Sequence, residues 1–467
     1  MKKRLISLIL AVLMLLSCAL AEETGNVPLM AYYECFAVPL GENALFEIPN
    51  EWGYQTSDAA DVPPMTSLLT DQNQMVMAMK LPADWEATDA SDALGIQSFM
   101  VEGTALMLGL TTPQSTRLQE MTINDMPAVL VSMNGQGFDI LWVGDSGDLY
   151  FFLFPNDDDA LVQQMISVAQ SLCVFRRKGE QVNPSSDFAY TADGGEVTIT
   201  DYVGTSEHVL IPDTIDGLPV TALGHRAFYE KTVTTVVVPD SVTEIGAACF
   251  SGDNYLVSLK LPDGLKRLPP ASLESCMRLY DFDLPQSLEK IYSSVFEFNY
   301  YLTHLTLPSS LTEIEQLNFI GLYGLQSLTL AEDNAAFKLD ETNGLLMTAD
   351  GTRLLHCFSD IVPAEEIILP EGVKIVDPFA FHYDYDVKRI VLPEGVETIG
   401  AMAFAMCPNL TEIVIPASVT DIGVMDGLDG RTGIISYKRN VIVTPEGCPA
   451  WNWAVETGAT VKSPEEN

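Results

Sequence analysis

The chain has 467 residues and is strongly acidic, with 64 Asp and Glu against 24 Lys and Arg and a formal net charge of −40. A chain of this length exceeds what one hydrophobic core normally serves, so we expect at least two domains. A field of this sign repels polyanions, which argues against nucleic acid and leaves cationic protein surfaces or divalent ions as partners. Acidity also keeps an exported protein soluble without any ligand.

The first 21 residues have the three parts of a secretory signal peptide. Three basic residues at 2–4 precede an apolar run over 5–16, and Ala19-Leu20-Ala21 supplies small residues for cleavage. A rival interpretation makes Cys18 a lipidated residue, although the bulky Leu16 fits a lipobox poorly. No other run reaches the roughly 20 apolar residues of a membrane span. We therefore expect a secreted or cell-surface protein, whose mature chain has a net charge of −43 once three basic residues are lost.

Residues 22–176 are expected to form an acidic α+β domain. Its first 154 residues, 22–175, hold 22 acidic residues but only Lys80 and Arg117 as basic ones. The order of elements predicts a mainly antiparallel sheet covered by helices, followed by a polar linker over 177–187. Strand patterns occur at 44–52, 75–82, 127–134, 138–144 and 148–155, and helical patterns at 91–108 and 156–175.

The second half of the chain repeats with a period of 23 residues. Prolines stand 23 residues apart from Pro239 to Pro308 and again from Pro370 to Pro416. Apolar residues occupy the positions one, three and six before each proline and three and six after it, and a large residue, mostly Phe, stands eleven after it. The alternation predicts a half-buried strand that the proline ends, because proline has no N–H for the ladder. A fixed period in this range predicts a solenoid, with the phenylalanines stacked in its core.

The repeat follows the pattern L-x-x-[LIF]-x-L-P-x-x-[LV]-x-x-[IL]-(x4)-F, as in LTEIVIPASVTDIG. This pattern resembles the BspA-type leucine-rich repeat of bacterial and protist surface proteins, over about residues 188–463. The resemblance implies a leucine-rich repeat solenoid with one parallel β-sheet over 188–446, a β-hairpin insertion at about 331–365, and a C-terminal cap and tail over 447–467. It also implies protein binding or adhesion at a cell surface, with no catalytic residue to carry over.

No motif for catalysis, a cofactor or a metal is apparent. All five histidines fall in the repeat half, so the N-terminal domain has no imidazole base for a nucleophile such as Cys35. The acidic residues at 145, 148 and 157–159 lack the spacing and terminal Glu of an EF-hand loop. The seven mature cysteines are odd in number and lack zinc-site spacing, and Cys276 and Cys407 are interpreted as small buried packing residues. We therefore expect a protein that is not an enzyme and needs no cofactor.

The candidate partner surface is the outer side of the repeat strands. Since positions one and three before each proline are buried, positions two and four before it should face solvent. This mixed row suits a broad contact with extracellular or surface proteins better than a small-molecule pocket. A plain solvated sheet face explains the same row, and loop tyrosines are a second candidate. The candidate residues are Ser258, Lys260, Asp281, Asp283, His304, Thr306, Ser327, Thr329, Arg389 and Glu412.

The main interpretation is a non-catalytic exported protein that binds other proteins, in cell-surface adhesion or a host or matrix interaction. Two alternatives stay open. In the first, the N-terminal domain is a ligand-binding or enzymatic module displayed on a repeat stalk, which a deep pocket with convergent polar groups would favour. In the second, the repeats are a structural spacer, and charge reversal of Asp281, Asp283 and Arg389 together loses no partner.

Overall fold

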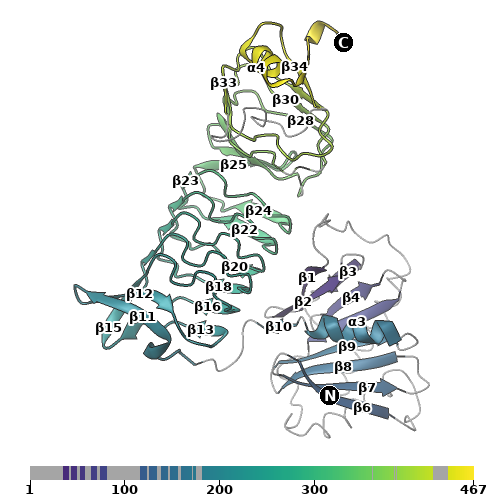
Figure 1. The fold of residues 1–467 in the computed structure, drawn as a ribbon, viewed down its shortest axis with the longest axis vertical. Coiled ribbons are helices and arrows are strands. Elements are labelled where there is room, and N and C mark those ends of the chain that lie inside the picture. The colour runs from purple at the N-terminus through teal and green to yellow at the C-terminus, as the bar shows by residue number, and fades with distance from the viewer. Residues whose placement is uncertain are drawn as a thin grey trace. The chain divides into compact units, whose positions relative to one another are not determined.

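The structure is a computed structural model, and its described residues form two compact units that divide between Glu180 and Gln181 (Figure 1). The helices in these ranges are too short or too polar to cross a bilayer. The predicted signal peptide with Cys18 and the helix predicted at 91–108 lie outside the described residues. These are 35–40, 44–49, 53–57, 65–70, 74–80, 116–123, 126–133, 138–145, 148–155, 159–170, 172–174, 181–359, 361–382, 384, 386–423 and 440–466.

The first unit contains two antiparallel sheets. One has the order β1-β2-β10, and the other has the order β3-β4-β5-β9-β8-β7-β6. All strand pairs of the larger sheet are antiparallel, as predicted. The strands are β1 Cys35–Pro39, β2 Ala44–Pro49, β3 Gly53–Ser57, β4 Met65–Leu69, β5 Met75–Lys80, β6 Thr116–Ile123, β7 Met126–Met133, β8 Phe138–Asp145, β9 Asp148–Pro155 and β10 Cys173–Val174.

Helix α3 (Asp159–Gln170) packs its apolar stripe into the core of this unit. Leu161, Met165 and Val168 are buried at the spacing of one helix face, and they share a cluster with Phe152 of β9. The Phe152 ring meets Phe46 of β2 edge to face at 5.5 Å between centroids. Sheet and helix therefore share one aromatic core, in line with the predicted α+β class.

Parallel strands of the second unit stack coil upon coil (Figure 1). In this main strand row, Ser258 of one coil pairs with Asp281 of the next, and Arg389 pairs with Glu412. The predicted solenoid with one parallel strand per period is confirmed. The row consists of β13 His208–Leu210, β16 Thr235–Val237, β18 Ser258–Lys260, β20 Asp281–Phe282, β22 His304–Leu307, β24 Ser327–Leu330, β28 Glu366–Ile368, β30 Arg389–Val391, β32 Glu412–Val414, β34 Val441–Val443 and β35 Thr460–Lys462.

The structure adds a second row of shorter parallel strands to the predicted sheet. Each proline begins the turn between the rows, since its carbonyl accepts the N–H of the third residue after it, as from Leu265 to Pro262 at 3.1 Å. The apolar residue six after the proline then points inward. This second strand row contains β15 Leu218–Leu223, β17 Glu244–Ile245, β19 Arg267–Leu268, β21 Lys290–Ile291, β23 Glu313–Ile314, β27 Arg353–Cys357, β29 Ile375–Val376, β31 Thr398–Ile399 and β33 Asp421–Ile422.

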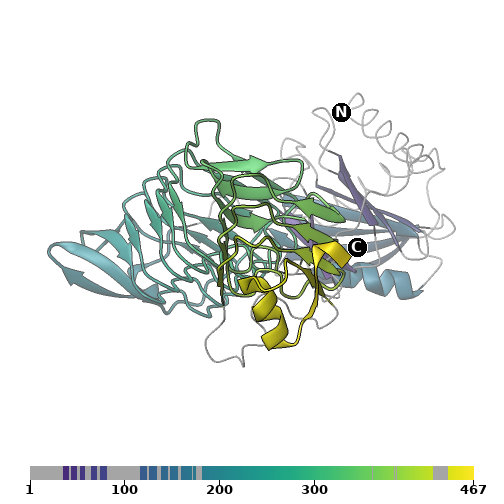
Figure 2. The same ribbon diagram turned by 90° about the horizontal axis from the view of Figure 1, so that it is seen from above.

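Both ends of the solenoid are covered. At the start, the 3₁₀ helix Ser185–Asp187 leads into a hairpin of β11 (Phe188–Asp193) and β12 (Glu196–Tyr202), seen projecting in Figure 2, and β14 (Thr214–Ile215) follows. At the other end, α4 (Pro449–Thr457) lies between β34 and β35, and the 3₁₀ helix Pro464–Glu466 ends the chain. Ala450 and Ala454 are the fully buried residues of α4, and the partly buried Trp453 also packs against the core.

The predicted phenylalanine stack runs along the core with an interruption. Phe228 and Phe250 stack at 5.2 Å between centroids, and Phe381 and Phe404 lie 5.3 Å apart. Leu273 takes the same position in the coil after Phe250 and is also fully buried. Three residues further on, Cys276 is buried and donates its thiol hydrogen to the Phe250 carbonyl at 3.1 Å. The thiol is therefore a packing residue that also gives a backbone carbonyl of the previous coil a hydrogen bond.

The insertion is a three-stranded meander rather than the predicted hairpin. It consists of β25 (Phe337–Asp340), β26 (Leu345–Thr348) and β27, paired antiparallel in that order. Leu345, Leu346 and Met347 are consecutive and all buried, as in a strand covered on both faces. Leu346 belongs to the core of the coils before the insertion, while Leu345 belongs to the core of the coils after it.

We call residues 337–358 the septum, because the two cores meet at its two faces. The coils before it (188–330) are the first block, and those after it (366–462) are the second block. The parallel pairing of β27 with β29 carries the second strand row across this boundary. The insertion therefore divides the core without ending the stack.

Candidate functional site

The main strand row presents its candidate residues on the side away from the core. Residues one and three before each proline, such as Leu261 and Leu259, are buried. Lys260 and Asp283, two before their prolines, are exposed. Ser258 departs from the prediction: it is only 8% exposed, and its hydroxyl donates to Asp281 Oδ2 at 2.6 Å. It therefore holds a surface carboxylate in place and is not itself a contact residue.

Lys260 and Asp283 are the unengaged charges of the first block's row. They occupy equivalent positions in neighbouring coils, and neither side chain makes a hydrogen bond or ion pair with any residue that the structure describes. Further along the row, the Thr306 and Thr329 hydroxyls meet at 2.9 Å, and His304 Nδ1 lies 2.8 Å from Thr303 Oγ1. Ser327 is half-buried in the same row. This face offers opposite charges and short hydroxyl side chains to a partner.

In the main strand row of the second block, charged side chains of neighbouring coils pair with one another. Arg389 Nε donates to Glu412 Oε1 at 2.5 Å, and its Nη1 donates to Glu366. These hydrogen bonds raise the pKa of Arg389 further above its ordinary value. Beside this charged column, Ile368 is 58% exposed and Val391 and Val414 are half-buried. Arg389 and Glu412 were both predicted as contact residues, but their charges are directed at each other.

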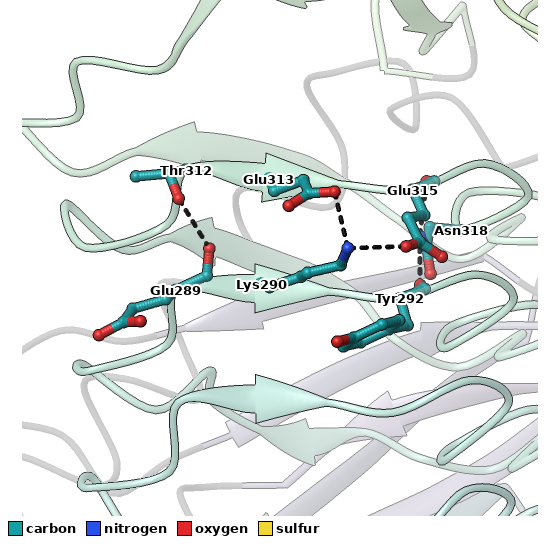
Figure 3. Close-up of polar contacts among 7 residues, drawn as sticks. All are labelled: Glu289, Lys290, Tyr292, Thr312, Glu313, Glu315 and Asn318. Atoms are coloured by element: carbon teal, nitrogen blue, oxygen red, sulfur yellow. Dashed lines mark hydrogen bonds and ion pairs between the residues drawn. The ribbon is translucent and has the colours of Figure 1, made fainter.

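Ion pairs between coils also follow the second strand row. Lys290 Nζ lies 2.7 Å from Glu313 Oε1 and 2.8 Å from Glu315 Oε1 (Figure 3). One position earlier in the repeat, Lys266 of the preceding coil pairs with Glu289 at 2.6 Å. The hydrogen bonds to Glu313 and Glu315 raise the pKa of Lys290. The sequence signal for this ladder is a Lys followed by a Glu 23 residues later, which the sequence analysis did not use.

A buried polar cluster at the septum was also missed. His356, His382 and Asp384 line a cavity of about 20 Å³, which holds about one water and no substrate. Burial lowers the pKa of His356 to about 3 and that of His382 to about 4, and burial raises the pKa of Asp384 to about 6. Burial is the largest cause of all three shifts, and the space between the side chains is too small for a substrate.

Four cysteines of the repeats have the character of packing residues. Cys249, Cys276, Cys357 and Cys407 are buried thiols outside any disulfide, and burial raises the pKa of Cys249 to about 12. A thiol of this kind is a poor nucleophile. Within the described ranges, no group of three or more His, Cys, Asp and Glu side chains is placed to hold a metal ion.

Comparison with known proteins agrees with the repeat architecture. Residues 221–340 and 355–425 match the family model of the BspA type leucine rich repeat region, in six copies. The gap in the match, 341–354, falls inside the septum. No curated protein matches the chain.

Solved bacterial leucine-rich repeat proteins are similar to the chain. A leucine-rich repeat protein of T. pallidum is 26% identical, with 49% of this chain and 91% of that chain covered and a TM-score of 0.33. One from Eubacterium ventriosum is 21% identical, with 57% and 78% covered and a TM-score of 0.43. A leucine rich cell surface protein of Faecalibacterium prausnitzii is 19% identical, with 62% and 96% covered and a TM-score of 0.35.

Proposed function

We propose that this protein, whose repeats are BspA-type leucine-rich repeats, is an exported, non-catalytic protein that binds other proteins through the first block's main strand row. The role we propose is adhesion at the cell surface or to a host or matrix protein. The observation that carries the proposal is the pair Lys260, at the end of β18, and Asp283, directly after β20, whose exposed side chains have no partner among the described residues. Charges held on a rigid sheet are already ordered, so a partner meets them at low entropic cost.

The structure narrows the choice of residues for the test. Reversing Arg389 would separate Glu366 and Glu412 from their shared cation, and reversing Asp281 would break its bond to Ser258. Both changes alter the coil stack as well as the surface. Lys260 and Asp283 have no such role, so their exchange changes the surface alone.

The test is binding of the full mature chain to immobilised collagen and laminin and to intact epithelial cells. The double swap Lys260→Glu with Asp283→Lys keeps the net charge and is expected to lower affinity about tenfold or more, as for contact residues near the centre of an interface. The matched control swaps Glu244→Lys with Arg267→Glu, two exposed neighbours in the second strand row, and should leave affinity unchanged. Far-UV circular dichroism checks that both variants keep their fold.

A wild-type chain that binds none of these targets, or two swaps that lose affinity equally, contradicts the proposal and favours the spacer. Export is tested separately by the mass of the protein recovered outside the cytoplasm. A chain that begins at Glu22 is expected from signal cleavage. An acylated chain that begins at Cys18 would instead establish the lipid anchor.

A further inference from the structure

A hollow of about 430 Å³ lies along the turns of three successive coils of the first block, away from the main strand row. Tyr229 and Glu230 line it from the first turn, Gly252 and Tyr255 from the second, and Glu274 from the third. The three turns are joined by backbone hydrogen bonds, from Glu230 N to Ser251 O at 3.0 Å and from Gly252 N to Glu274 O at 2.8 Å. The floor of the hollow is therefore a ladder of turns.

The middle turn of the hollow has a glycine at the position where the neighbouring turns carry a side chain. Glu230, Gly252 and Ser275 occupy the same phase and share a left-handed backbone, with φ of 50°, 75° and 58°. Glycine adopts this conformation without strain, and its missing side chain leaves room for the side chain of Glu230. A Cβ at Gly252 would come within 2.9 Å of Glu230 Cγ. The methylene groups of Glu230 therefore lie over Gly252, and Glu230 lines the hollow.

Two carboxylates converge on this space. Glu230 is exposed and Glu274 is half-buried, with the Ser251 hydroxyl donating to Glu274 Oε2 at 3.5 Å. A hydrogen bond to Glu230, together with the charges of Glu230 and Glu274, raises the pKa of Tyr229. Both negative charges therefore act on the same phenol.

The cations around the hollow are already engaged. The Arg226 guanidinium lies over the Tyr229 ring at 4.6 Å from its centroid. Lys231 Nζ, on the lining, lies 2.8 Å from Asp201 Oδ1. Glu230 and Glu274 are the two carboxylates of the lining and have no ion pair among the described residues, and they lie beside the Tyr255 side chain, which is 54% exposed.

We propose that this groove binds a lysine or arginine side chain presented by a partner protein. The carboxylates meet the cationic head in charge-assisted hydrogen bonds, and the tyrosine rings and the Met277 thioether cover the methylene stem. Charge complementarity selects a basic residue, because the groove and the mature chain are both negative. This is a second contact surface, separate from the main strand row.

The test uses the full chain and two capped tripeptides, acetyl-Gly-Lys-Gly-amide and the same peptide with an acetylated lysine side chain, titrated by ligand-observed NMR. The wild type should bind the first in the millimolar range and the second at least about fivefold more weakly. Glu230→Gln with Glu274→Gln should lower affinity for the first at least about fivefold. The control Glu371→Gln with Glu394→Gln removes two exposed charges from turns of the second block and should leave the affinity for the lysine tripeptide unchanged.

A further variant, Asn254→Lys, places a cation on the rim of the folded groove and should weaken binding without removing an acid. The strand-row swap of Lys260 and Asp283 should not affect the tripeptide, so this test and that of the proposed function fail independently. Equal losses in the groove and control variants would show attraction to the acidic chain in general and overturn the proposal. Equal binding of the acetylated tripeptide, or no binding of lysine at all, would overturn it too.

Discussion

The two blocks of coils share their buried residues and differ in their exposed ones. Three residues before the proline, Leu259 and Ile390 fill the same inward position and are both buried. At the outward positions, the first block leaves Lys260 and Asp283 unengaged among the described residues, whereas the second block closes Arg389 between Glu366 and Glu412. A surface charge of this solenoid can meet a partner only where the residue at the equivalent position of the neighbouring coil does not already pair with it.

The largest expected effect comes from substitutions in the septum that destabilise the two cores separately. Leu346→Ala should cost the first block about 2–5 kcal/mol, and Leu345→Ala should cost the second block a similar amount, since each leaves a cavity in a different core. Hydrogen exchange read by mass spectrometry should show faster exchange in 208–330 for the first variant and in 366–443 for the second. The exposed Glu341→Ala should change neither. If both leucine variants loosen both blocks equally, the septum does not divide the core.

The next effect is a pH dependence located at the septum. Burial lowers the pKa of His356 to about 3, so as pH falls below about 6.5 the unfolded chain takes up the proton first. Stability is complete above that pH and falls by roughly 1.4 kcal/mol per pH unit for this histidine until its folded pKa is reached. Asp384 opposes this trend, because its raised pKa of about 6 makes it favour the folded state at low pH.

A comparison with His356→Phe isolates the histidine. Phe319 and Phe358 already contact the His356 ring, so phenylalanine suits the site chemically. Between pH 7 and pH 5 the unfolding free energy of the variant should improve relative to wild type by about 2 kcal/mol. Urea unfolding at the two pH values measures it. An unchanged difference between the two proteins would mean that His356 is protonated without cost in the fold.

The smallest effect distinguishes engaged from unengaged charges. Arg389→Met should cost up to about 1 kcal/mol, because the ion pairs are partly exposed and two carboxylates are left facing one another. Lys260→Met should stay within about 0.5 kcal/mol of wild type. Thermal unfolding in low salt and in 1 M salt checks both, since salt should reduce the Arg389 effect. Equal costs at the two sites would remove the distinction between the blocks.

Sequence periodicity was a reliable guide to the backbone and the core. The 23-residue spacing of the prolines predicted the parallel register that pairs Ser258 with Asp281, and the alternation around each proline predicted which side is buried. It failed at Ser258, because a short side chain can bond to a neighbouring coil and be covered by it. It also missed the second face of β26, since a run such as Leu345-Leu346-Met347 has no alternation to read.

The sequence by itself determined the solenoid, its strand row and its acidity, because a period fixes which residues recur in equivalent positions. The tertiary structure alone decided which of those residues are still available. Arg389 forms ion pairs with both neighbouring coils, Gly252 leaves room for the side chain of Glu230, and three residues of the insertion form the wall between two cores. The physical reason is that each coil contacts its neighbours in the stack, which lie more than 20 positions away in the sequence, and these distant neighbours, not the local sequence, satisfy or leave open its charges.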